Sequence, residues 1–323
     1  MLRIKRISSL LAVIVLTATT AGCANAEKVK SKETVKENKP GQVLNIGLMP
    51  AEDAVACTIA KERGYFEKYG VNVDLEIFKS AKDRDAAFQA GKLDGVSTDE
   101  VAVALYQNAG TELKITGVVD GDFILIASKE SGIKSINDVK GKSVAISENT
   151  VIEYTMDRML EKNSIDPKDV KKTVIPAIPT RLEMLRGNKI DLALLPEPFA
   201  SFALNDGCIS LGKATDNALY PAVMGFTNKS ISEKAEEIKA FHKAYNDAVE
   251  YINKTSISEY EDLVIKTVGY PEEMKGKIVL PEYRNTQLPT DGELQDVLEW
   301  TKAKGIIKDS ITTKDLVNSI AVK

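Results

Sequence analysis

The stretch Gly91-Lys-Leu-Asp-Gly-Val-Ser-Thr-Asp-Glu100 decides the fold class, because a close counterpart recurs farther along the chain, at Gly187-Asn-Lys-Ile-Asp-Leu-Ala-Leu-Leu-Pro-Glu-Pro198. In both stretches a glycine ends an expected helix and an aspartate precedes a short apolar run, as where a helix C-cap leads into a strand. Each apolar run then stops at an acidic residue. The sequence therefore predicts the same helix, strand and acidic loop in two separate parts of the chain.

Strand and helix patterns alternate throughout both parts of the chain. Short apolar or alternating runs predict strands at 43–48, 71–78, 93–97, 114–119, 123–128, 143–147, 172–176 and 191–195. Helical patterns lie between them, and helices at 233–253, 258–268, 291–304 and 313–320 follow a strand-like run that begins at Val223. This alternation predicts an α/β protein of two units, each built on a mostly parallel sheet with helices on both faces.

The acidic residues that end the two quoted stretches fall just beyond predicted strands. Ligands of open α/β sheets bind outside the carboxyl ends of the strands. If the two units face each other, we expect Asp99 from the first unit and Glu197 from the second to look into one cleft. Asp94 and Asp191 stand at the starts of the same strands, so we expect them to lie away from that cleft.

The first 41 residues differ from the rest of the chain. Basic residues, an apolar core at 10–16 and small residues up to Thr20-Ala-Gly-Cys23 form the pattern of a secretory signal peptide over residues 1–22. The ending resembles the bacterial lipobox, so Cys23 is the predicted lipidation site; the alternative is a plain secreted protein. Residues 23–41 are rich in lysine and glutamate and predict a flexible tether from a lipid anchor in the cell membrane, facing outside the cytoplasm.

The composition argues against several classes of function. The chain has 323 residues and a formal net charge of −4, so it lacks the basic surplus of a nucleic-acid-binding protein. Its single histidine, His242, lies in an amphipathic helical segment and is expected on or near the surface. The sequence has no Cys/His cluster for a metal, no nucleophile elbow and no phosphate loop, so we predict no metal, no cofactor and no enzyme. Cys57 and Cys208 are predicted to be buried and unpaired.

Several stretches together carry a resemblance to a known family. They are Ala60-Lys-Glu-Arg-Gly-Tyr-Phe-Glu-Lys-Tyr-Gly-Val-Asn-Val73, Gly91-Lys-Leu-Asp94, Ile133-Lys-Ser-Ile-Asn-Asp-Val-Lys-Gly-Lys142 and Pro196-Glu-Pro-Phe199. By the order and spacing of these stretches, the chain from Leu44 to Val322 resembles the solute-binding proteins of ABC importers. The resemblance is to the group that serves nitrate, sulfonates, thiamine and its pyrimidine precursors. The chain also resembles a pyrimidine synthase of thiamine biosynthesis that has the same fold.

The resemblance implies a type II periplasmic-binding-protein fold, with two lobes, a hinge and a cleft between them. Lobe one would hold residues 43–128 and 222–323, and lobe two residues 129–221, with hinge crossings at 128–133 and 220–226. The resemblance also implies a monomer that closes around a small-molecule ligand and then docks on ABC permease subunits.

The loops that follow predicted strands all carry carboxylates, and they supply most of the candidate ligand-binding residues. The candidates are Asp53, Asp99, Asp122, Glu148, Asn149, Tyr154, Glu197, Phe199, Tyr220 and Tyr283. Acidic residues at helix N-termini also act as caps, so capping is the alternative for the carboxylates. The spacings Ser97-x-x-Glu100 and Thr150-x-x-Glu153 fit the capping box, which favours caps at Glu100 and Glu153. For the aromatic candidates, packing in the core is the alternative.

The acidic lining of the cleft determines the predicted ligand class. Anions favour helix N-termini, hydroxyls and arginine, and only Arg181 is expected near the cleft. The sequence therefore favours a cationic or amine-rich heterocycle, such as thiamine or its pyrimidine precursor. A sulfonate, nitrate or similar anion is the first alternative. Alternatives of other classes are a pyrimidine-synthesis enzyme and an envelope sensor or adhesin of the same fold.

Overall fold

The computed structural model describes residues 42–79 and 81–322, all of which fall within one compact unit that spans residues 40–323. The predicted signal peptide, the lipidation site at Cys23 and the tether lie outside the described residues. In the described part of the chain, no helix combines the length and the apolar character needed to cross a bilayer.

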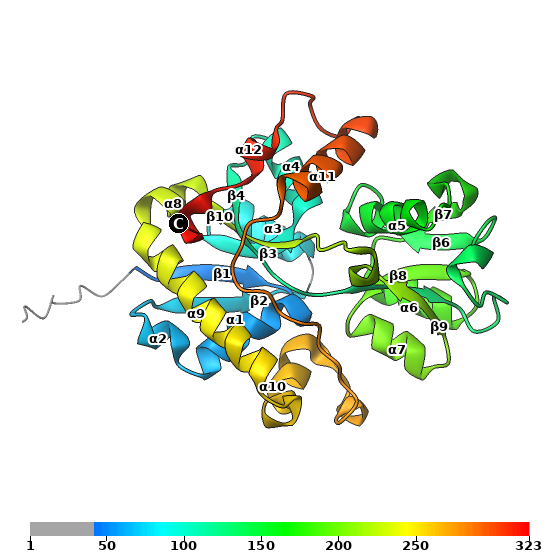
Figure 1. Cartoon of the computed structure of the whole chain (residues 1–323), viewed down its shortest axis with the longest axis horizontal. Coiled ribbons are helices and arrows are strands. Elements are labelled where there is room, and N and C mark those ends of the chain that lie inside the picture. The colour runs from blue at the N-terminus through cyan, green and yellow to red at the C-terminus, as the bar shows by residue number, and fades with distance from the viewer. Residues whose placement is uncertain (1–41, 80, 323) are drawn as a thin grey trace, which may run out of the picture. The chain divides into compact units, whose positions relative to one another are not determined.

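Two separate five-stranded sheets form the framework of this unit (Figure 1). The first sheet has the order β2-β1-β3-β10-β4, with β1 at Leu44–Leu48, β2 at Val73–Ile77, β3 at Gly95–Asp99, β4 at Leu113–Val118 and β10 at Ala222–Thr227. The second has the order β7-β6-β8-β5-β9, with β5 at Phe123–Ala127, β6 at Ser143–Ile146, β7 at Lys171–Val174, β8 at Leu192–Pro196 and β9 at Ile209–Lys213. The two predicted α/β units are therefore present, and β9 is a strand that the sequence pattern did not indicate.

Both sheets are mixed, where the sequence predicted mostly parallel pairing. In the first sheet β1 runs parallel to β2 and β3, whereas β10 is antiparallel to β3 and β4. In the second sheet β6 is parallel to β7 and β8, whereas β5 is antiparallel to β8 and β9. The two antiparallel strands, β5 and β10, are the ones that the chain enters directly after crossing from the other sheet.

The position of β5 moves the proposed boundary between the lobes. Residues 123–128 were assigned to lobe one, yet β5 pairs from Phe123 with Pro196 to Ala127 with Leu192, inside the second sheet. The chain therefore crosses at 120–122 and 214–221, instead of at 128–133 and 220–226. An apolar run predicts a strand but does not say which sheet it joins, which is why the sequence misplaced it. From here on, lobe one is the first sheet with its helices and lobe two is the second sheet with its helices.

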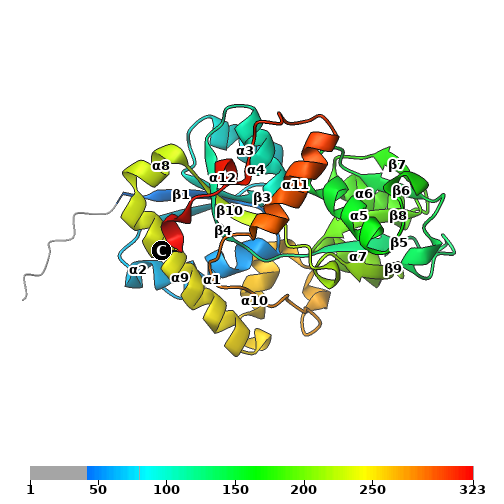
Figure 2. The same cartoon turned by 45° about the horizontal axis from the view of Figure 1, so that its top comes forward.

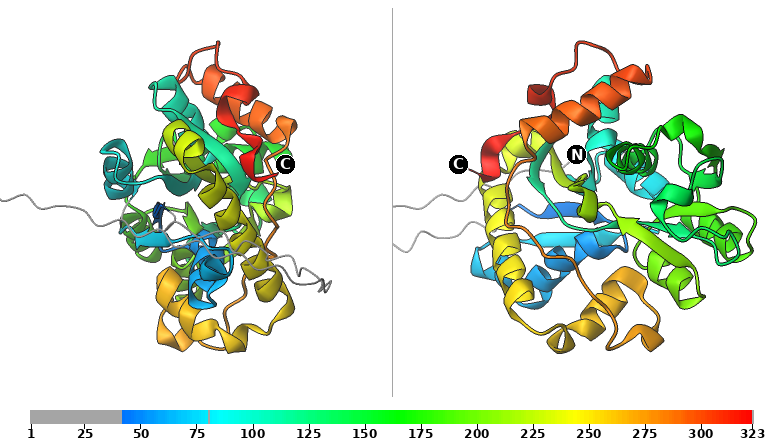
Figure 3. Two further views of the ribbon diagram at one scale, coloured as in Figure 1. Left: turned by 90° about the vertical axis from the view of Figure 1, so that its left-hand side faces the viewer. Right: turned by 45° about the vertical axis from the view of Figure 1, so that its right-hand side comes forward.

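Helices cover both faces of each sheet. Lobe one contains α1 (Val55–Glu62), α2 (Tyr65–Lys68), α3 (Ala81–Gln89), α4 (Glu100–Asn108), α8 (Asn228–Glu233), α9 (Ala235–Lys254), α10 (Glu261–Val264), α11 (Asp291–Ala303) and α12 (Thr313–Leu316). α1 and α9 pack on one face of its sheet, and α4 and α11 on the other. The long helix α9, yellow in Figure 3, passes along α1 and α2. The predicted helix at 258–268 is instead split into a 3-10 turn, α10 and a π-helical turn at Ile265–Gly269.

Lobe two contains α5 (Val151–Lys162), α6 (Ile178–Arg186) and α7 (Phe199–Asn205). α5 packs on one face of the second sheet and α6 and α7 on the other. Alternate residues of β5 divide between these two cores, with Leu125 on the α5 side and Ile124 and Ile126 on the other. A strand buried on both faces reads as a continuous apolar run, as Phe123–Ala127 does.

The repeated stretch has the same structural task in both lobes. Asp94 accepts a hydrogen bond from the backbone N of Asn45 at 2.9 Å, at the start of β1. Asp191 accepts one from the backbone N of Ser143 at 2.8 Å, at the start of β6. Each aspartate thus ties the start of its own strand to the start of the neighbouring parallel strand. The prediction that both lie at strand starts is confirmed.

His242 is buried, which corrects its predicted surface position. It is 3 % exposed, its Nε2 lies 2.9 Å from Thr116 Oγ1, and its Nδ1 lies 3.1 Å from Thr286 Oγ1. Burial lowers the His242 pKa to about 3, so the ring is neutral at physiological pH. The amphipathic pattern located an apolar face on α9 but did not show that His242 belongs to it. Cys57 and Cys208 are buried and unpaired, as predicted.

Candidate functional site

The carboxyl ends of parallel strands carry predicted carboxylates in both lobes. β1 and β3 run parallel, so Asp53 and Asp99 lie beyond the same edge of the first sheet. β6 and β8 also run parallel, and Glu197 follows β8 at the corresponding edge of the second sheet. These edges define the region in which a ligand of an α/β fold is expected.

Hydrogen bonds within lobe one engage both of its predicted carboxylates. The Ser97 hydroxyl donates to the Asp53 carboxylate, and Asp99 Oδ1 accepts from the backbone N of Ala102 at 2.8 Å, which makes Asp99 the N-cap of α4. The predicted cap at Ser97 is wrong because β3 continues through Ser97 to Asp99. Burial raises the Asp99 pKa to about 6. Ligand contact by Asp53 or Asp99 stays a prediction.

Glu100 does not cap α4, contrary to the prediction. With Asp99 as the N-cap, Glu100 is the first helical residue and does not occupy the third position that the capping box requires. Glu100 is 2 % exposed, and its Oε1 has no hydrogen-bond partner among the described residues. Burial first, and then the charges of Glu293 and Asp99, raise the Glu100 pKa to about 8.

Glu153 does serve the start of its helix, as predicted. Its Oε2 accepts from the backbone N of Asn149 at 2.8 Å, just ahead of the N-cap residue Thr150. Its Oε1 accepts from Lys172 Nζ at 2.9 Å and lies 2.7 Å from Lys304 Nζ. Lys304 follows α11 in lobe one, so this ion pair joins the two lobes.

Glu148 and Asn149 lie in the loop between β6 and α5. Glu148 is exposed, and Asn149 has a φ of 58°, a left-handed conformation that asparagine tolerates better than most residues. Within the described chain, neither side chain makes a hydrogen bond to another residue. Their role as ligand contacts stays a prediction.

The charge of Glu197 acts on Glu52, a carboxyl of lobe one that the sequence analysis missed. Glu197 accepts from the backbone N and the hydroxyl of Ser201, each at 3.0 Å. Glu52 is 3 % exposed, and burial first and the charge of Glu197 second raise its pKa to about 8. Burial also raises the Glu197 pKa. We call Glu52 and Glu197 the acidic junction. That Asp99 and Glu197 look into one cleft stays a prediction.

Glu52 is held by neighbours from distant parts of lobe one and the first crossing. It accepts from the Tyr270 hydroxyl at 3.2 Å and from the backbone N of Asp122 at 3.3 Å. The sequence offered no signal that separates it from Asp53, because both belong to one acidic turn. Only the packing of the segment around Tyr270 over that turn buries Glu52.

Asp122 joins the two crossing segments to each other. Its Oδ2 accepts from the Thr215 hydroxyl at 2.5 Å, and its Oδ1 accepts from the backbone N of Phe123 at 2.9 Å. Asp122 is 7 % exposed. Its carboxylate therefore fixes the geometry where the chain passes between lobes, and direct contact with a ligand stays a prediction.

The four aromatic candidates divide into two pairs. Phe199 packs edge-to-face on Phe202 in the lobe-two core, with ring centroids 6.0 Å apart. Tyr283 is 2 % exposed and donates to the backbone O of Glu52 at 2.8 Å, within the lobe-one core. Tyr154 and Tyr220 instead line a pocket of about 500 Å³ between α4, α5, α11 and the second crossing.

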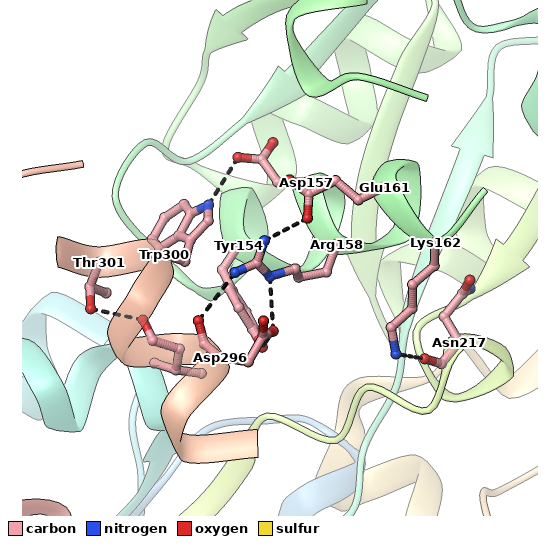
Figure 4. A network of polar contacts seen from close by, with 10 residues as sticks. Tyr154, Asp157, Arg158, Glu161, Lys162, Asn217, Asp296, Trp300 and Thr301 are labelled. Carbon is pink, nitrogen blue, oxygen red and sulfur yellow. Dashed lines mark hydrogen bonds and ion pairs between the residues drawn. The ribbon is translucent and has the colours of Figure 1, made fainter. Parts of the chain in front are cut away.

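Polar contacts join α5 of lobe two to α11 of lobe one, and Figures 1 and 2 both show the two helices side by side. Asp296 Oδ2 accepts from the Tyr154 hydroxyl and from Arg158 Nε, both at 2.8 Å, and Asp157 accepts from Trp300 Nε1 at 3.0 Å (Figure 4). Tyr154 and Trp300 also stack edge-to-face, with ring centroids 5.6 Å apart. We call these five residues the α5–α11 junction.

Arg181 is an unusual positive charge in the interior of lobe two. It lies in the first half of α6 and is 1 % exposed, and its Nη1 donates to the backbone O of Ile175 at 3.1 Å, just beyond the end of β7. Its Nε has no hydrogen-bond partner within residues 42–79 and 81–322. Burial alone lowers the Arg181 pKa to about 10, with no carboxylate to offset it. The guanidinium therefore lies beside the carboxyl end of β7, and burial is the one influence on its pKa.

The described residues hold no group of three or more His, Cys, Asp or Glu side chains arranged to bind a metal ion. The arrangement offers carboxyl groups with raised pKa values, a buried guanidinium and a pocket between two lobes. These are features of recognition by hydrogen bonds and charge.

Comparisons with known proteins agree with this architecture. A family model described as NMT1/THI5 like matches residues 52–255. The structure is similar to the crystal structure of the periplasmic aliphatic sulphonate binding protein SsuA from Escherichia coli, with a TM-score of 0.71 and 18 % identity, over 85 % of this chain and 92 % of that one. The predicted two-lobed, type II periplasmic-binding-protein fold is confirmed.

Two curated relatives match over most of the chain. It is 26 % identical over 237 residues to the nitrate import ATP-binding protein NrtC of Synechocystis, which covers 64 % of this chain and 34 % of that protein. It is 25 % identical over 288 residues to a Haemophilus influenzae protein named "Putative thiamine biosynthesis protein", which covers 81 % of this chain and 87 % of that one. The chain thus spans about a third of the first relative and most of the second.

Proposed function

Because the chain belongs to the NMT1/THI5-like family, we propose that it is an extracytoplasmic solute-binding protein of an ABC importer. The observation that supports the proposal is the pair of five-stranded sheets, each with helices on both faces, joined by two crossing segments. The protein holds a small molecule between its lobes and presents the closed form to ABC permease subunits. It acts as a monomer without chemistry on the ligand, and a lipid anchor at Cys23 keeps it at the membrane.

The ligand class that we propose is a small oxoanion, such as a sulfonate or nitrate. The names of SsuA and NrtC support this class. Arg181 supports it too, because an anion would supply the negative charge that this buried guanidinium lacks. The acidic residues oppose anion binding less than the sequence implied. Glu52 and Glu100 have pKa values of about 8, so at pH 7 they are mostly protonated and act as uncharged hydrogen-bond donors.

The second candidate ligand is an amine-rich heterocycle such as thiamine or its pyrimidine precursor. The Haemophilus influenzae relative, matched over most of its length, favours it. So does the acidic junction, since a ligand that donates N–H bonds would offset the charge that Glu197 exerts on Glu52. Asp53 and Asp99 supply further acceptors at the same edge of lobe one.

Calorimetric titration of residues 40–323 with nitrate, ethanesulfonate, thiamine and hydroxymethylpyrimidine tests the proposal. We expect saturable binding of an anion and none of the two heterocycles. The reverse result would replace the ligand class and leave the binding function in place. Appearance of a new product by mass spectrometry during incubation would overturn the proposal of binding without chemistry.

Arg181→Met tests the anion class from the side of the protein. We expect at least a tenfold loss of anion affinity, because the charge is removed, and no loss of folding. Replacing a buried charge by an apolar residue of similar length is often neutral or stabilising. Arg186→Met is the matched control, since Arg186 lies on the same helix and pairs with Glu183 on the outer surface. Unchanged affinity in Arg181→Met would exclude Arg181 from anion recognition.

A further inference from the structure

A pocket on the outer side of lobe one lies away from the region between the lobes. It has a volume of about 430 Å³ and is formed by α9 and the C-terminal segment that follows α12. Figures 1 and 2 both show the labelled C-terminus beside α9, on the side of lobe one that lies away from lobe two. The described lining residues all belong to lobe one. We call this cavity the α9 pocket.

One face of α9 forms the first wall of the α9 pocket. Lys239, His242, Lys243 and Asn246 line it, and residues at this spacing project from the same side of a helix. His242 is the buried member of this face, and its ring is neutral at physiological pH. Lys239 is half-buried and Lys243 is exposed. The positive charge of this wall therefore comes from two lysines that are one helical turn apart.

The C-terminal segment forms the second wall. Val317 makes a parallel bridge to Ile115 of β4, and the backbone N of Asn318 donates to the backbone O of Ile115 at 2.8 Å. These contacts hold the segment beside the outer strand of the first sheet, and the same segment also contacts α9. Asn318, Ile320 and Ala321 then line the pocket. The cavity is therefore built between a helix and a segment that is anchored on the sheet.

The hydrogen bonds of the two lining asparagines determine which end of each amide is free. Asn246 Oδ1 accepts from the backbone N of Thr286 at 2.7 Å, and Asn318 Oδ1 accepts from the backbone N of Ile320 at 3.0 Å. Because an N–H donor engages each oxygen, the NH₂ group is the other end of each amide, and it donates to no residue within 42–79 and 81–322. Both NH₂ groups are therefore available to a ligand.

The two lysines are also available to a ligand. Lys239 Nζ lies 2.8 Å from Glu236, but the Glu236 side chain is 83 % exposed, and exposed ion pairs contribute little to stability. Lys243 makes no hydrogen bond or ion pair with another described residue, and its charge contributes, after the Lys239 hydrogen bond, to lowering the Glu236 pKa. The described lining contains no Asp or Glu. It therefore offers two ammonium groups and two amide groups, all of them donors.

This set of donors favours a phosphate monoester. At pH 7 a phosphoryl group carries a charge of about −1.5 to −2 and has three strong acceptor oxygens, whereas a carboxylate has one charge and two oxygens. Lysine is a common phosphate binder. Two ammonium groups and two amide groups therefore match a phosphoryl group better than a carboxylate. Ile320 and Ala321 give an apolar contact for the short carbon chain of such an ester.

We propose that the α9 pocket binds the phosphoryl group of a small phosphate monoester through Lys239, Lys243 and the amide groups of Asn246 and Asn318. This site goes beyond the proposed transport function, because its described lining comes from α9 and the C-terminal segment of lobe one alone. The loops that follow the parallel strands, where the transported ligand is expected, do not contribute to it. The protein thus has a place for a second small molecule on its outer surface.

Calorimetric titration of residues 40–323 with glycerol 3-phosphate, in a buffer without phosphate, tests the proposal. We expect saturable binding, no binding of glycerol, and weaker binding of succinate, which offers carboxylates in place of the phosphoryl group. Sedimentation with phosphatidylglycerol vesicles separates a lipid phosphate from a free monoester, and we expect no co-sedimentation. Absence of saturable glycerol 3-phosphate binding, equal affinity for succinate, or binding to the vesicles alone would overturn the proposal.

Asn318→Asp is the decisive variant. It keeps an oxygen that accepts from the backbone N of Ile320, and it replaces the NH₂ donor by a negative oxygen that repels a phosphoryl group. We expect a loss of glycerol 3-phosphate affinity of about tenfold or more, with an unchanged urea midpoint. Lys254→Gln, near the end of α9, is the matched control, because it lowers the net charge equally and affects only an exposed pair with Glu250. Equal affinity in the two variants would refute the assignment.

Titrations with both kinds of ligand separate this site from the proposed transport site. Asn318→Asp should bind nitrate or ethanesulfonate as the unmodified chain does, and Arg181→Met should bind glycerol 3-phosphate as the unmodified chain does. If neither nitrate nor ethanesulfonate binds, the transport proposal loses its ligand class and the glycerol 3-phosphate result stands. Loss of glycerol 3-phosphate binding in Arg181→Met would place the phosphate between the lobes and overturn the second site.

Discussion

At the α5–α11 junction the two lobes present complementary groups to each other, whereas at the acidic junction each lobe contributes a carboxyl. At the α5–α11 junction, Asp296 accepts hydrogen bonds from the Arg158 guanidinium and the Tyr154 hydroxyl. Asp157 accepts one from the indole N–H of Trp300. At the acidic junction, burial and the charge of Glu197 raise the Glu52 pKa to about 8, so Glu52 is mostly protonated at pH 7. The α5–α11 junction therefore stabilises this arrangement of the lobes by its own hydrogen bonds, whereas the acidic junction is favourable only when a proton or another donor offsets the negative charge.

Trp300 lets both junctions be followed in solution. It is the single tryptophan of the chain, it lies on α11, and its indole N–H bonds to Asp157 of the opposite lobe. Trp300 is 6 % exposed in this structure. Separation of α5 from α11 would expose the ring to water, so a red shift of its emission reports opening of the lobes.

The largest effect is expected at the acidic junction, with Glu52→Gln. The folded Glu52 pKa of about 8 exceeds its ordinary value of 4.5, so between these pH values the unfolded chain loses a proton that the folded chain keeps. This carboxyl therefore lowers the free energy of unfolding as pH rises, by roughly 1 kcal/mol per unit. The variant has no titrating carboxyl at this position. Between pH 5 and pH 8 its free energy of unfolding should therefore rise by about 3 kcal/mol relative to that of the unmodified chain.

Urea unfolding at pH 5, 6, 7 and 8 measures this difference. Glu100 and His242 titrate in both proteins, so their contributions cancel in the comparison. His242 acts with the opposite sign: its folded pKa of about 3 lies below its ordinary value of 6.5, so its contribution to stability is lost as pH falls below 6.5. Parallel pH profiles for the two proteins would show that the acidic junction does not hold an extra proton.

The next effect is expected at the α5–α11 junction, with Asp296→Ala. This change removes the shared acceptor of Tyr154 and Arg158, and hydrogen bonds to a charged group are worth about 2 kcal/mol. We expect a red shift of Trp300 emission and a larger radius of gyration by small-angle X-ray scattering. Glu299→Gln on the same helix is the control. Unchanged emission in Asp296→Ala would mean that the junction does not hold the lobes together.

The smallest effect is expected with Tyr154→Phe. This variant keeps the ring against Trp300 and removes only the hydroxyl that donates to Asp296. The expected loss is about 1 kcal/mol, measured as a smaller shift of the same emission and a lower urea midpoint. A shift as large as that of Asp296→Ala would assign the whole junction to the tyrosine hydroxyl and leave no role for Arg158.

The repeated stretch shows how far sequence reasoning reaches in this protein. A glycine, an aspartate and an apolar run are local features, so they predicted β3 and β8 and the positions of Asp94 and Asp191 at the strand starts. The same reasoning misassigned the N-terminal cap of α4 to Ser97 and Glu100, whereas the structure shows Asp99 as the cap. Whether Ser97 or Asp99 caps α4 depends on where β3 ends, and pairing with β10 sets that end.

The candidate site shows the same limit. The strand pattern drew attention to Glu197, but it gave no sign that the charge of Glu197 acts on the buried Glu52. The sequence predicts Tyr154 as a ligand contact, and the structure adds a hydrogen bond from its hydroxyl to Asp296, a residue far away in sequence that no spacing rule connects to it. Contacts between the lobes depend on how the two folded lobes are placed relative to each other. A pattern of residues along the sequence does not predict that placement.

Local periodicity and the order of motifs along the chain were enough to predict two α/β units and the family of the protein. The placement of β5 in the second sheet and the burial of His242 came from the three-dimensional structure alone. Only the tertiary structure also showed that Glu52 and Glu100 hold raised pKa values. The physical reason is that burial, and the ionisation that depends on it, is set by neighbours that are distant in sequence.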